Sequence, residues 1–376
     1  MYACDSNRGQ KVQKRIFERR QPRRGFVCRV RLWCSCVVYR PPYGSGMSIT
    51  ARAVRITQPG GPEVLTIEEI EVREPGPSEV LVRVAAAGLN RADCLQRKGA
   101  YPAPPGVAAD VPGLEFSGTV EKLGEGARDF AVGDLVMGIC GGGSMATHIV
   151  VHERELMRIP RNLGLIEAAA IPEVFMTSYD ALFSQAELQP GERLLVHAIG
   201  SGIGTAALQL ARAIGATVIG TSRSQQKIDQ VQTLGLGLSH GIVADENGFA
   251  EALKGNGGGV DVLLDTIGAK YLVENLKAIA PRGRIVVIGL LGGTKAELPL
   301  GVLVAKRVSL RGSVLRSRPL EEKAALAQRF SRQIVPLFEQ GVLRPIIADV
   351  MPMTDIREAH RRMESNDLLG KLVLAW

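Results

Sequence analysis

Long apolar runs and cysteines are both scarce in this sequence. No uninterrupted apolar stretch approaches the roughly 20 residues that a helix needs to span a bilayer, so we expect no membrane segment and no membrane partner. Of the 6 cysteines, only Cys94 and Cys140 lie beyond residue 46, too few for a disulfide framework. The body of the chain is therefore predicted to be a soluble protein of a reducing, cytoplasmic setting.

Acidic residues are scarce in the first 46 positions, where 11 Lys and Arg residues stand against Asp5 and Glu18. The rest of the chain carries 35 basic and 36 acidic groups, so the formal net charge of +8 belongs to this extension. We therefore expect no nucleic-acid partner for the body. Within the extension, Cys28, Cys34 and Cys36 have a C-x5-C-x-C spacing with no nearby histidine, which is not a standard zinc pattern.

Residues 1–46 show no clear period of helix or strand, and three interpretations stay open. An Arg-rich, acid-poor segment can be a targeting peptide. It can also be an arm that binds nucleic acid or a membrane surface. The third interpretation, which we favour, is upstream sequence outside the mature folded protein, with Met47 as the natural start. The stretch VVYRPPYGSGM would then mark the boundary, because a strand pattern begins at Ala53.

The body of the chain changes character at Pro172. From residue 47 to 171, short strand-like runs alternate with Gly and Pro turn signals, which predicts a mostly antiparallel, barrel-like domain. From 172 to 308, apolar strands alternate with helical segments, which predicts a doubly wound parallel sheet. Residues 309–376 end in the strand-like KLVLAW, and we expect them to pack on the first domain. The predicted fold class is α/β with two domains.

A glycine-containing turn joins an apolar strand, residues 193–200, to a segment with helical spacing, residues 203–214. A strand that leads directly into a helix N-terminus points several backbone N–H groups at one place, which favours a bound phosphate. Aligned on Gly204, the G-x-G-x-x-G fingerprint has Ile199 and Ser201 where two glycines belong. The glycine motif by itself is weak evidence, but the strand before it and the helical segment after it support the prediction of a phosphate site. The alternative is a tight turn that binds nothing.

No acidic residue occurs between Arg193 and Ile228, the stretch in which an NAD site places the acid that binds the ribose hydroxyls. Ser222, Arg223 and Lys227 stand there instead. A 2′-phosphate with nearly two negative charges pairs with Arg and Lys, so the pattern favours NADPH over NADH. The alternative is that the two cations only solvate the start of a helix.

Several separate motifs follow one another along residues 50–376. They are GLNRADCLQRKGAYPAPPG (88–106), PGLEFSGTVEKLGEG (112–126), AAAIPEVFMTSYDAL (168–182), SGIGTAALQLAR (201–212), VLRSRP (314–319) and AHRRMESNDLLGKLVL (359–374). Through these motifs the chain resembles the medium-chain dehydrogenase/reductase superfamily, and within it the zinc-free quinone oxidoreductase (zeta-crystallin-like) branch. The resemblance implies a GroES-like catalytic domain and a Rossmann domain that binds NADPH.

Zinc-dependent members of that superfamily carry a Cys in G-x-C-x-x-D and a His in G-H-E. This chain has Asn90 and Leu114 at those positions, and neither replaces a zinc ligand. Alcohol oxidation needs a Lewis acid, whereas a quinone accepts hydride directly and spreads the developing charge over its ring. The resemblance implies that Tyr101 lines the quinone site and that Asn90 touches the substrate or the nicotinamide. Alternatively, Tyr101 only packs its loop and Asn90 only caps a turn.

The resemblance also implies a set of cofactor contacts. They are Thr177, Ser201, Gly202, Ile203, Gly204, Thr205, Ser222, Arg223, Lys227, Gly289, Leu290, Leu291, Leu315, Arg316 and Ser317. The chain departs from close relatives at Gly241-Ile242 and at Leu368, so no contact is assigned there. We expect His197 to be a core residue with its hydrogen bonds satisfied, and Cys94 and Cys140 to be small buried hydrophobes.

The leading hypothesis is a zinc-independent, NADPH-dependent quinone oxidoreductase. A second hypothesis is NADPH-dependent reduction of an activated C=C bond in an enone or alkenal, which the same hydride geometry serves. A third is an NADPH-binding protein with little turnover. The resemblance implies a homodimer formed through the cofactor domain.

Overall fold

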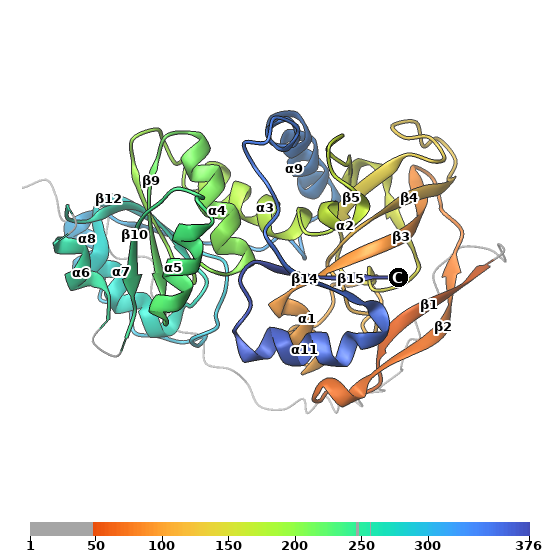
Figure 1. Ribbon diagram of the computed structural model, residues 1–376, viewed down its shortest axis with the longest axis horizontal. Coiled ribbons are helices and arrows are strands. Elements are labelled where there is room, and N and C mark those ends of the chain that lie inside the picture. The colour runs from red at the N-terminus through yellow and green to blue at the C-terminus, as the bar shows by residue number, and fades with distance from the viewer. Residues whose placement is uncertain (1–47, 246–247, 256) are drawn as a thin grey trace, which may run out of the picture. The chain divides into compact units, whose positions relative to one another are not determined.

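The computed structural model of the protein describes residues 48–245, 248–255 and 257–376. The expectations for residues 1–46 and for Met47 therefore lie outside the described residues. Two large sheets and a separate pair of strands organise the described chain (Figure 1). No helix in these ranges is long and apolar enough to cross a bilayer.

A mostly antiparallel sheet of seven strands forms the first domain. Its order is β14-β15-β3-β4-β5-β7, and β6 also pairs with β3. The strands are β3 (Glu79–Leu89), β4 (Glu115–Leu123), β5 (Leu135–Ile139), β6 (His148–His152), β7 (Leu156–Arg158), β14 (Ile347–Pro352) and β15 (Lys371–Ala375). The apolar strand β3 is buried along most of its length because β15, β4 and β6 all pair with it. Antiparallel β1 (Ser48–Ile56) and β2 (Leu65–Arg73) form the separate pair.

The end of the chain returns to the first domain, as predicted. β15 runs antiparallel to β3, with Leu372 opposite Leu89. The helices outside the parallel domain are α1 (Arg91–Arg97), α2 (Leu165–Ala168), α3 (Pro172–Tyr179), α9 (Leu320–Gln333), α10 (Val335–Glu339) and α11 (Ile356–Ser365). Residues 309–312 depart from the expectation that the first domain resumes at residue 309. They form β13 (Ser309–Gly312), which pairs with β12 because its backbone groups satisfy the open edge of that strand.

A parallel sheet of six strands forms the second domain, in the order β10-β9-β8-β11-β12-β13. Counted along the chain, this is the 3-2-1-4-5-6 order of a doubly wound sheet, so the predicted α/β fold class is confirmed. The strands are β8 (Arg193–Val196), β9 (Thr217–Ser222), β10 (Leu238–Val243), β11 (Val260–Asp265), β12 (Ile279–Val287) and β13. The helices are α4 (Gly202–Ala213), α5 (Gln225–Thr233), α6 (Ala250–Lys254), α7 (Leu272–Ala278) and α8 (Leu300–Lys306). Such sheets bind ligands where the strand order reverses, here at the carboxyl ends of β8 and β11.

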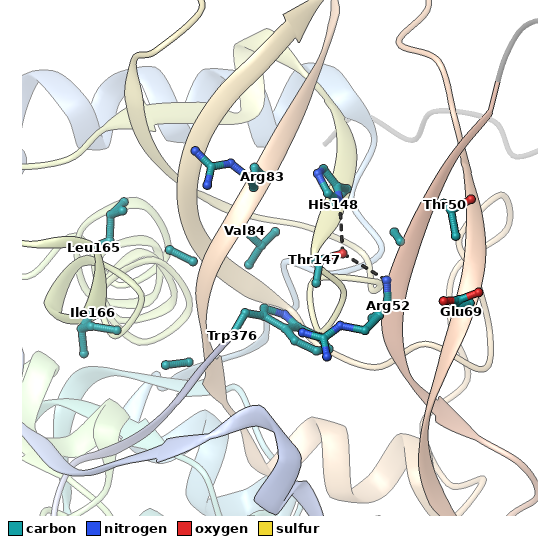
Figure 2. A pocket seen from close by; sticks show the side chains of 13 residues that line it. Thr50, Arg52, Glu69, Arg83, Val84, Thr147, His148, Leu165, Ile166 and Trp376 are labelled. Atoms are coloured by element: carbon teal, nitrogen blue, oxygen red, sulfur yellow. Dashed lines mark hydrogen bonds between the residues drawn. The ribbon is translucent and has the colours of Figure 1, made fainter.

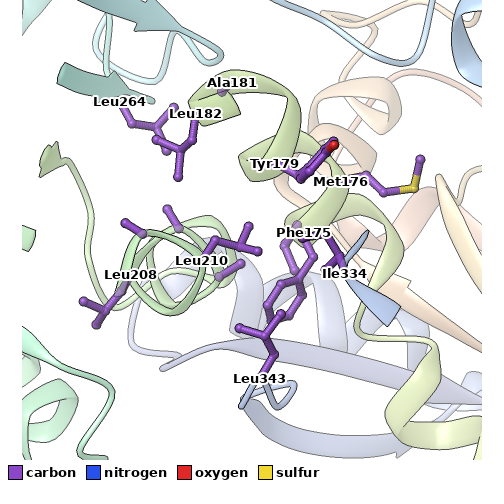
Figure 3. Close-up of a cluster of buried hydrophobic side chains, with 14 of the residues drawn as sticks. Phe175, Met176, Tyr179, Ala181, Leu182, Leu208, Leu210, Leu264, Ile334 and Leu343 are labelled. Carbon is purple, nitrogen blue, oxygen red and sulfur yellow. The ribbon is translucent and has the colours of Figure 1, made fainter. Parts of the chain in front are cut away.

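One hydrophobic core joins the parallel sheet to α3 and to the C-terminal helices. Figure 3 shows side chains of α3, α4 and β11 gathered there with Ile334 and Leu343. The rings of Phe175 on α3 and Phe338 on α10 meet edge to face, with their centroids 4.8 Å apart. Because both faces of α3 are packed in this way, the helix holds its side chains at a fixed position beside the parallel sheet.

Candidate functional site

The turn between β8 and α4 has the geometry of an anion site. Ser201 is the N-cap of α4, and its Oγ accepts a hydrogen bond of 3.0 Å from the N–H of Gly204. A Cβ at Gly204 would overlap the carbonyl oxygens of Ala198 and Ile199, so this glycine allows the helix to lie close to the strand. Within the described residues, no acceptor binds the N–H group of Ile203, which leaves it for an anionic ligand, whereas Ser201 forms a parallel bridge with Gly370.

The two cations predicted at the 2′-phosphate have different surroundings. Arg223, just after β9, is exposed, and its guanidinium has no hydrogen bond or ion pair with any described residue. Lys227 in α5 instead donates from Nζ to the carbonyl oxygens of Asn366 and Leu368, the latter at 3.1 Å. Burial lowers the pKa of Lys227. Arg223 is therefore available to a phosphate, whereas Lys227 holds the loop before β15.

Two buried hydroxyls without partners lie on elements that border the reversal point. Thr177 Oγ1 on α3 and Thr266 Oγ1 just after β11 have no hydrogen-bond partner among the described residues. Gly289 approaches this segment so closely that a Cβ there would lie 2.8 Å from the carbonyl oxygen of Thr266. An unsatisfied buried polar group costs about 1–3 kcal/mol. Both hydroxyls therefore fit a ligand with polar groups, such as the carboxamide of a nicotinamide.

The other residues predicted to contact the cofactor differ in how far their side chains are exposed to solvent. Thr205 is buried in α4 and Ser222 is buried at the end of β9. Leu290 and Leu291 follow β12, and each is 53% exposed. Leu315 is buried in the core, whereas Ser317, two residues later, is exposed.

Arg316 is committed to the loop that carries Tyr101. Its Nε donates to the carbonyl oxygen of Gly141 at 2.7 Å, Nη1 to that of Tyr101 at 3.2 Å, and Nη2 to Gln96 Oε1 at 2.5 Å. The guanidinium carbon lies 4.7 Å from the centroid of the Tyr101 ring. Three of its five N–H groups are engaged in this way, and the side chain is buried among these partners. Arg316 thus fixes the Tyr101 loop, and the cofactor contact implied for it by the resemblance stays a prediction.

Tyr101 itself presents a free hydroxyl. Its ring is held by Arg316, and no described residue hydrogen-bonds to its hydroxyl group. The pKa of Tyr101 is raised, first by burial and then by the nearby carboxyl of Glu173. The geometry is that of a fixed aromatic surface with a neutral hydroxyl at its edge, and the substrate-lining role implied for Tyr101 stays a prediction.

Asn90 belongs to a buried ionic network. Its Oδ1 accepts from Lys371 Nζ at 2.6 Å, and its Nδ2 donates to Glu115 Oε1 at 2.9 Å and to the carbonyl oxygen of Gly88 at 3.2 Å. Lys371 and Glu115 form an ion pair of 2.6 Å, and both are buried. Because both amide hydrogens and the oxygen of Asn90 are engaged, its side chain organises the network. The contact of Asn90 with substrate or nicotinamide, which the resemblance implies, stays a prediction.

Two carboxyl groups beside this network were not among the predicted site residues. Glu173, in the first turn of α3, is half-buried, and its pKa is raised to about 8, first by desolvation and then by the charge of Glu115. Asp93 is fully buried, and desolvation raises its pKa to about 6 although its oxygens accept N–H groups of Asn90 and Gly113. The sequence held one signal: an acid stands four residues before Thr177 in an otherwise apolar helix.

A separate hollow of the described chain lies away from these residues. A cavity of about 700 Å³ lies on the first domain and contains none of the predicted site residues. Figure 2 shows the guanidinium of Arg52 over the indole of Trp376, with their centres 5.4 Å apart. Thr147 Oγ1 accepts from the backbone N–H of Arg52 at 3.1 Å and lies 3.1 Å from His148 Nδ1. This cavity is separate from the cofactor turn.

Comparison with known proteins identifies the family. Residues 202–332 match the family described as zinc-binding dehydrogenase, and residues 76–161 match the alcohol dehydrogenase GroES-like domain. Quinone oxidoreductase-like protein 2 of Mus musculus is 31% identical over 314 residues, covering 83% of this chain and 89% of that protein. The chain belongs to the medium-chain dehydrogenase/reductase superfamily, in its quinone oxidoreductase-like branch.

Two further comparisons agree with this membership. The 2-haloacrylate reductase of Burkholderia sp is 30% identical over 333 residues, covering 86% of this chain and 98% of that protein. The crystal structure of the quinone oxidoreductase of Pseudomonas syringae pv. Tomato DC3000 has a TM-score of 0.77 at 28% identity, covering 87% of this chain and all of that one. The predicted superfamily and branch are confirmed. The protein is an oxidoreductase of this superfamily, and its dinucleotide-binding domain suggests a nicotinamide cofactor.

The chain matches a family described as zinc-binding, but Asn90 and Leu114 stand at the two positions where zinc-dependent members carry ligands. In this quinone oxidoreductase-like protein, Asn90 is engaged by Lys371 and Glu115, and Leu114 is buried. Across the described ranges, no group of three or more His, Cys, Asp and Glu side chains is arranged to hold a metal ion. An amide and an alkyl group do not replace thiolate and imidazole.

The remaining singled-out residues have structural roles, as predicted. His197 is buried, with Nδ1 lying 2.8 Å from Thr221 Oγ1 and Nε2 lying 2.7 Å from Asn275 Oδ1. Cys94 and Cys140 are buried and free, and burial raises the pKa of each thiol to about 12. Thiols of this kind are poor nucleophiles, because only the thiolate reacts.

Proposed function

We propose that this protein is an NADPH-dependent quinone oxidoreductase that works without zinc. The observation that supports the proposal best is the state of Asn90, whose amide stands at a zinc-ligand position and is bound by Lys371 and Glu115. Alcohol oxidation needs a Lewis acid to stabilise an alkoxide. A quinone does not, because its ring spreads the charge that develops. Relatives named as quinone oxidoreductases at about 30% identity add support.

The chain's own residues bind and orient the two reactants. When bound, the cofactor supplies the hydride. The backbone N–H groups at the start of α4, that of Ile203 among them, bind its pyrophosphate. The free hydroxyls of Thr177 and Thr266 orient the nicotinamide, and Tyr101 lines the acceptor side with its ring held in place. Alignment of the two reactants is the main contribution of the protein.

The preference for NADPH depends on Arg223. Between Arg193 and Ile228 no acid is present to bind ribose hydroxyls, and the guanidinium of Arg223 is free for a 2′-phosphate. A charge-assisted hydrogen bond contributes about 1.5–3 kcal/mol, so Arg223→Ala should raise the KM for NADPH roughly 10- to 100-fold and leave that for NADH unchanged. Arg329→Ala, which removes an exposed Arg of α9, serves as the control. An unchanged NADPH-to-NADH preference in Arg223→Ala would contradict the assignment.

The activity is tested by NADPH oxidation with a panel of quinones and alkenals. We expect faster turnover with an ortho- or para-quinone. A second candidate, reduction of an activated C=C bond, is favoured by the similarity to a 2-haloacrylate reductase. Faster turnover of an alkenal would support that candidate. Quenching of protein fluorescence by NADPH with no oxidation by any acceptor would support a binding protein with little turnover.

We further propose that the protein forms a homodimer through the parallel domain. The edge strand β13 is exposed along its length, and no residue of α8 is buried. On α8, Leu300 is 62% exposed and Val304 is 72% exposed. An open strand edge beside apolar side chains fits the same surface of a second copy. Val304→Lys should convert the dimer to a monomer in light scattering, and a monomeric wild-type protein would refute the proposal.

We also propose a reducing, cytoplasmic setting. Cys94 and Cys140 are free thiols, the state that such a compartment maintains. Recovery of the full chain in an organelle or membrane fraction of its native cells would contradict this proposal.

A further inference from the structure

Glu173 has an unusual place in the candidate active site. It lies in the first turn of α3, and its backbone N–H donates to Glu115 Oε2 at 2.8 Å. Thr177, with its unpartnered hydroxyl, lies one helical turn further on. Residues four apart project from the same face of a helix. The carboxyl of Glu173 is therefore on the side of α3 that is assigned to the nicotinamide.

The carboxyl of Glu173 has no counter-ion of its own. Two negative groups face it, Glu115 and Asp93, and two positive groups, Lys371 and Arg316. Both cations are already committed: Lys371 Nζ binds Glu115, Asn90 and the carbonyl oxygen of Leu89, and Arg316 binds three acceptors of the first domain.. Among the described residues, none hydrogen-bonds to the Glu173 carboxyl.

These surroundings keep the Glu173 carboxyl protonated. A helix N-terminus ordinarily favours a carboxylate in its first turn. Here burial and the ionised Glu115 outweigh that effect and raise the pKa to about 8. The charge of the same carboxyl also contributes to the raised pKa of Tyr101, after burial. A neutral acid thus lies in the first turn of α3, one helical turn before the unpartnered hydroxyl of Thr177.

We propose that Glu173 is the general acid that protonates the reduced acceptor; this role rests on the proposed quinone reductase function. Hydride from NADPH brings two electrons and one proton to the quinone, which leaves a hydroquinone monoanion and NADP⁺. The O–H bond of Glu173 then breaks, its electron pair stays on the carboxylate, and the proton forms an O–H bond on the anionic oxygen. The product is a neutral hydroquinone. A proton from water restores the acid.

The neighbouring groups are less suited to this step. Both oxygens of Asp93 are engaged by backbone N–H groups, at 2.8 Å from Asn90 and 3.0 Å from Gly113. The hydroxyl of Tyr101 has its pKa raised above the ordinary value, which makes it a weaker acid than Glu173. Tyr101 can donate a hydrogen bond to the acceptor, while Glu173 supplies the proton.

Glu173→Gln tests the role, with Glu167→Gln as the matched control. Glu167 is an exposed acid on the neighbouring helix α2, so its replacement removes the same charge outside the site. We expect kcat with a quinone to fall on the order of 100-fold in E173Q, with NADPH affinity by fluorescence within about twofold of wild type. Wild-type kcat/KM should decline as the pH rises through about 8, and E173Q should lose this dependence. Glu173→Asp should recover part of the activity, since it keeps an acid.

Infrared spectroscopy provides a readout without cofactor or turnover. The difference between wild type and E173Q should show the C=O stretch of a protonated carboxylic acid at neutral pH, lost on titration through about 8. A carboxylate band at neutral pH overturns the role, as does an E173Q variant with wild-type kcat and pH profile. A wild-type protein that binds NADPH but reduces no quinone refutes the proposed function and this role together. The two failures are therefore distinguishable.

Discussion

Replacement of Arg316 distinguishes two roles for this residue. The structure shows it holding the loop of Tyr101, and the motif predicts that it contacts the cofactor. Its guanidinium makes three hydrogen bonds, to Gly141, Tyr101 and Gln96, and covers the Tyr101 ring at 4.7 Å. We therefore expect Arg316→Ala to loosen the loop of Tyr101 and to raise the KM for the quinone. The affinity for NADPH should change little, because three of the five N–H groups of Arg316 and one face of its guanidinium are engaged within the first domain.

The magnitude follows from the interactions that would be lost. A hydrogen bond from a charged donor contributes about 1.5–3 kcal/mol, and a cation–π contact about 0.5–2 kcal/mol. These contributions share one side chain and are not additive. We expect Arg316→Ala to lower the free energy of unfolding by about 1–3 kcal/mol, the range for leaving a buried acceptor without its donor. Arg316→Lys should be intermediate, since an ammonium keeps the charge but cannot reproduce the three-way geometry.

Three measurements on the same variants check this reasoning. Urea unfolding gives the stability, fluorescence quenching gives the Kd for NADPH, and steady-state kinetics give the KM for the quinone. Arg316→Lys keeps the test valid if the alanine variant fails to fold. A variant of unchanged stability whose Kd for NADPH rises more than about tenfold, equivalent to 1.4 kcal/mol, would refute the role and restore Arg316 as a cofactor contact.

Three further predictions concern the network and the cofactor turn. Lys371→Met should destabilise the fold by about 3–5 kcal/mol in urea unfolding because it leaves Glu115 buried and unpaired; a loss below about 1 kcal/mol would argue that the pair is solvated. Gly204→Ala should abolish NADPH binding or folding, because a Cβ there overlaps strand carbonyl oxygens, whereas Gly301→Ala, with open space around it, should bind normally. The pKa of Asp93 is raised from 3.8 to about 6, so the folded state holds its proton longer and stability should fall as the pH rises between these values. Asp93→Asn should flatten that part of the stability profile, and an unchanged slope would contradict the shift.

The fold was largely predictable because its signals are local. Alternating strand and helix patterns predicted the parallel sheet, and the apolar strand at the chain end predicted the return to the first domain. The strand at residues 309–312 was not predicted as part of the parallel sheet, because all four residues are exposed and their sequence has no apolar period. Their membership of the parallel sheet depends on the hydrogen-bonding groups that β12 leaves open at its edge.

The site was predictable only in part. The turn at Ser201 followed from sequence because adjacent residues supply both its cap and its free N–H groups. Arg316 was assigned to the cofactor because a motif shows that an Arg is present but not which partners its N–H groups meet. The motif around Asn90 likewise shows that an Asn is present but not that Lys371 binds its side-chain oxygen.

The sequence by itself determined the family, the doubly wound order, the phosphate turn and the acid-free segment after it. These features depend on residues that are neighbours in the chain. Only the tertiary structure decided what Arg316 and Glu173 do. Arg316 reaches Tyr101 across 215 positions, and Glu173 meets Glu115 across 58. The protonation state of a carboxyl depends on how much water its neighbours exclude and on which charges they place beside it, and packing alone sets both.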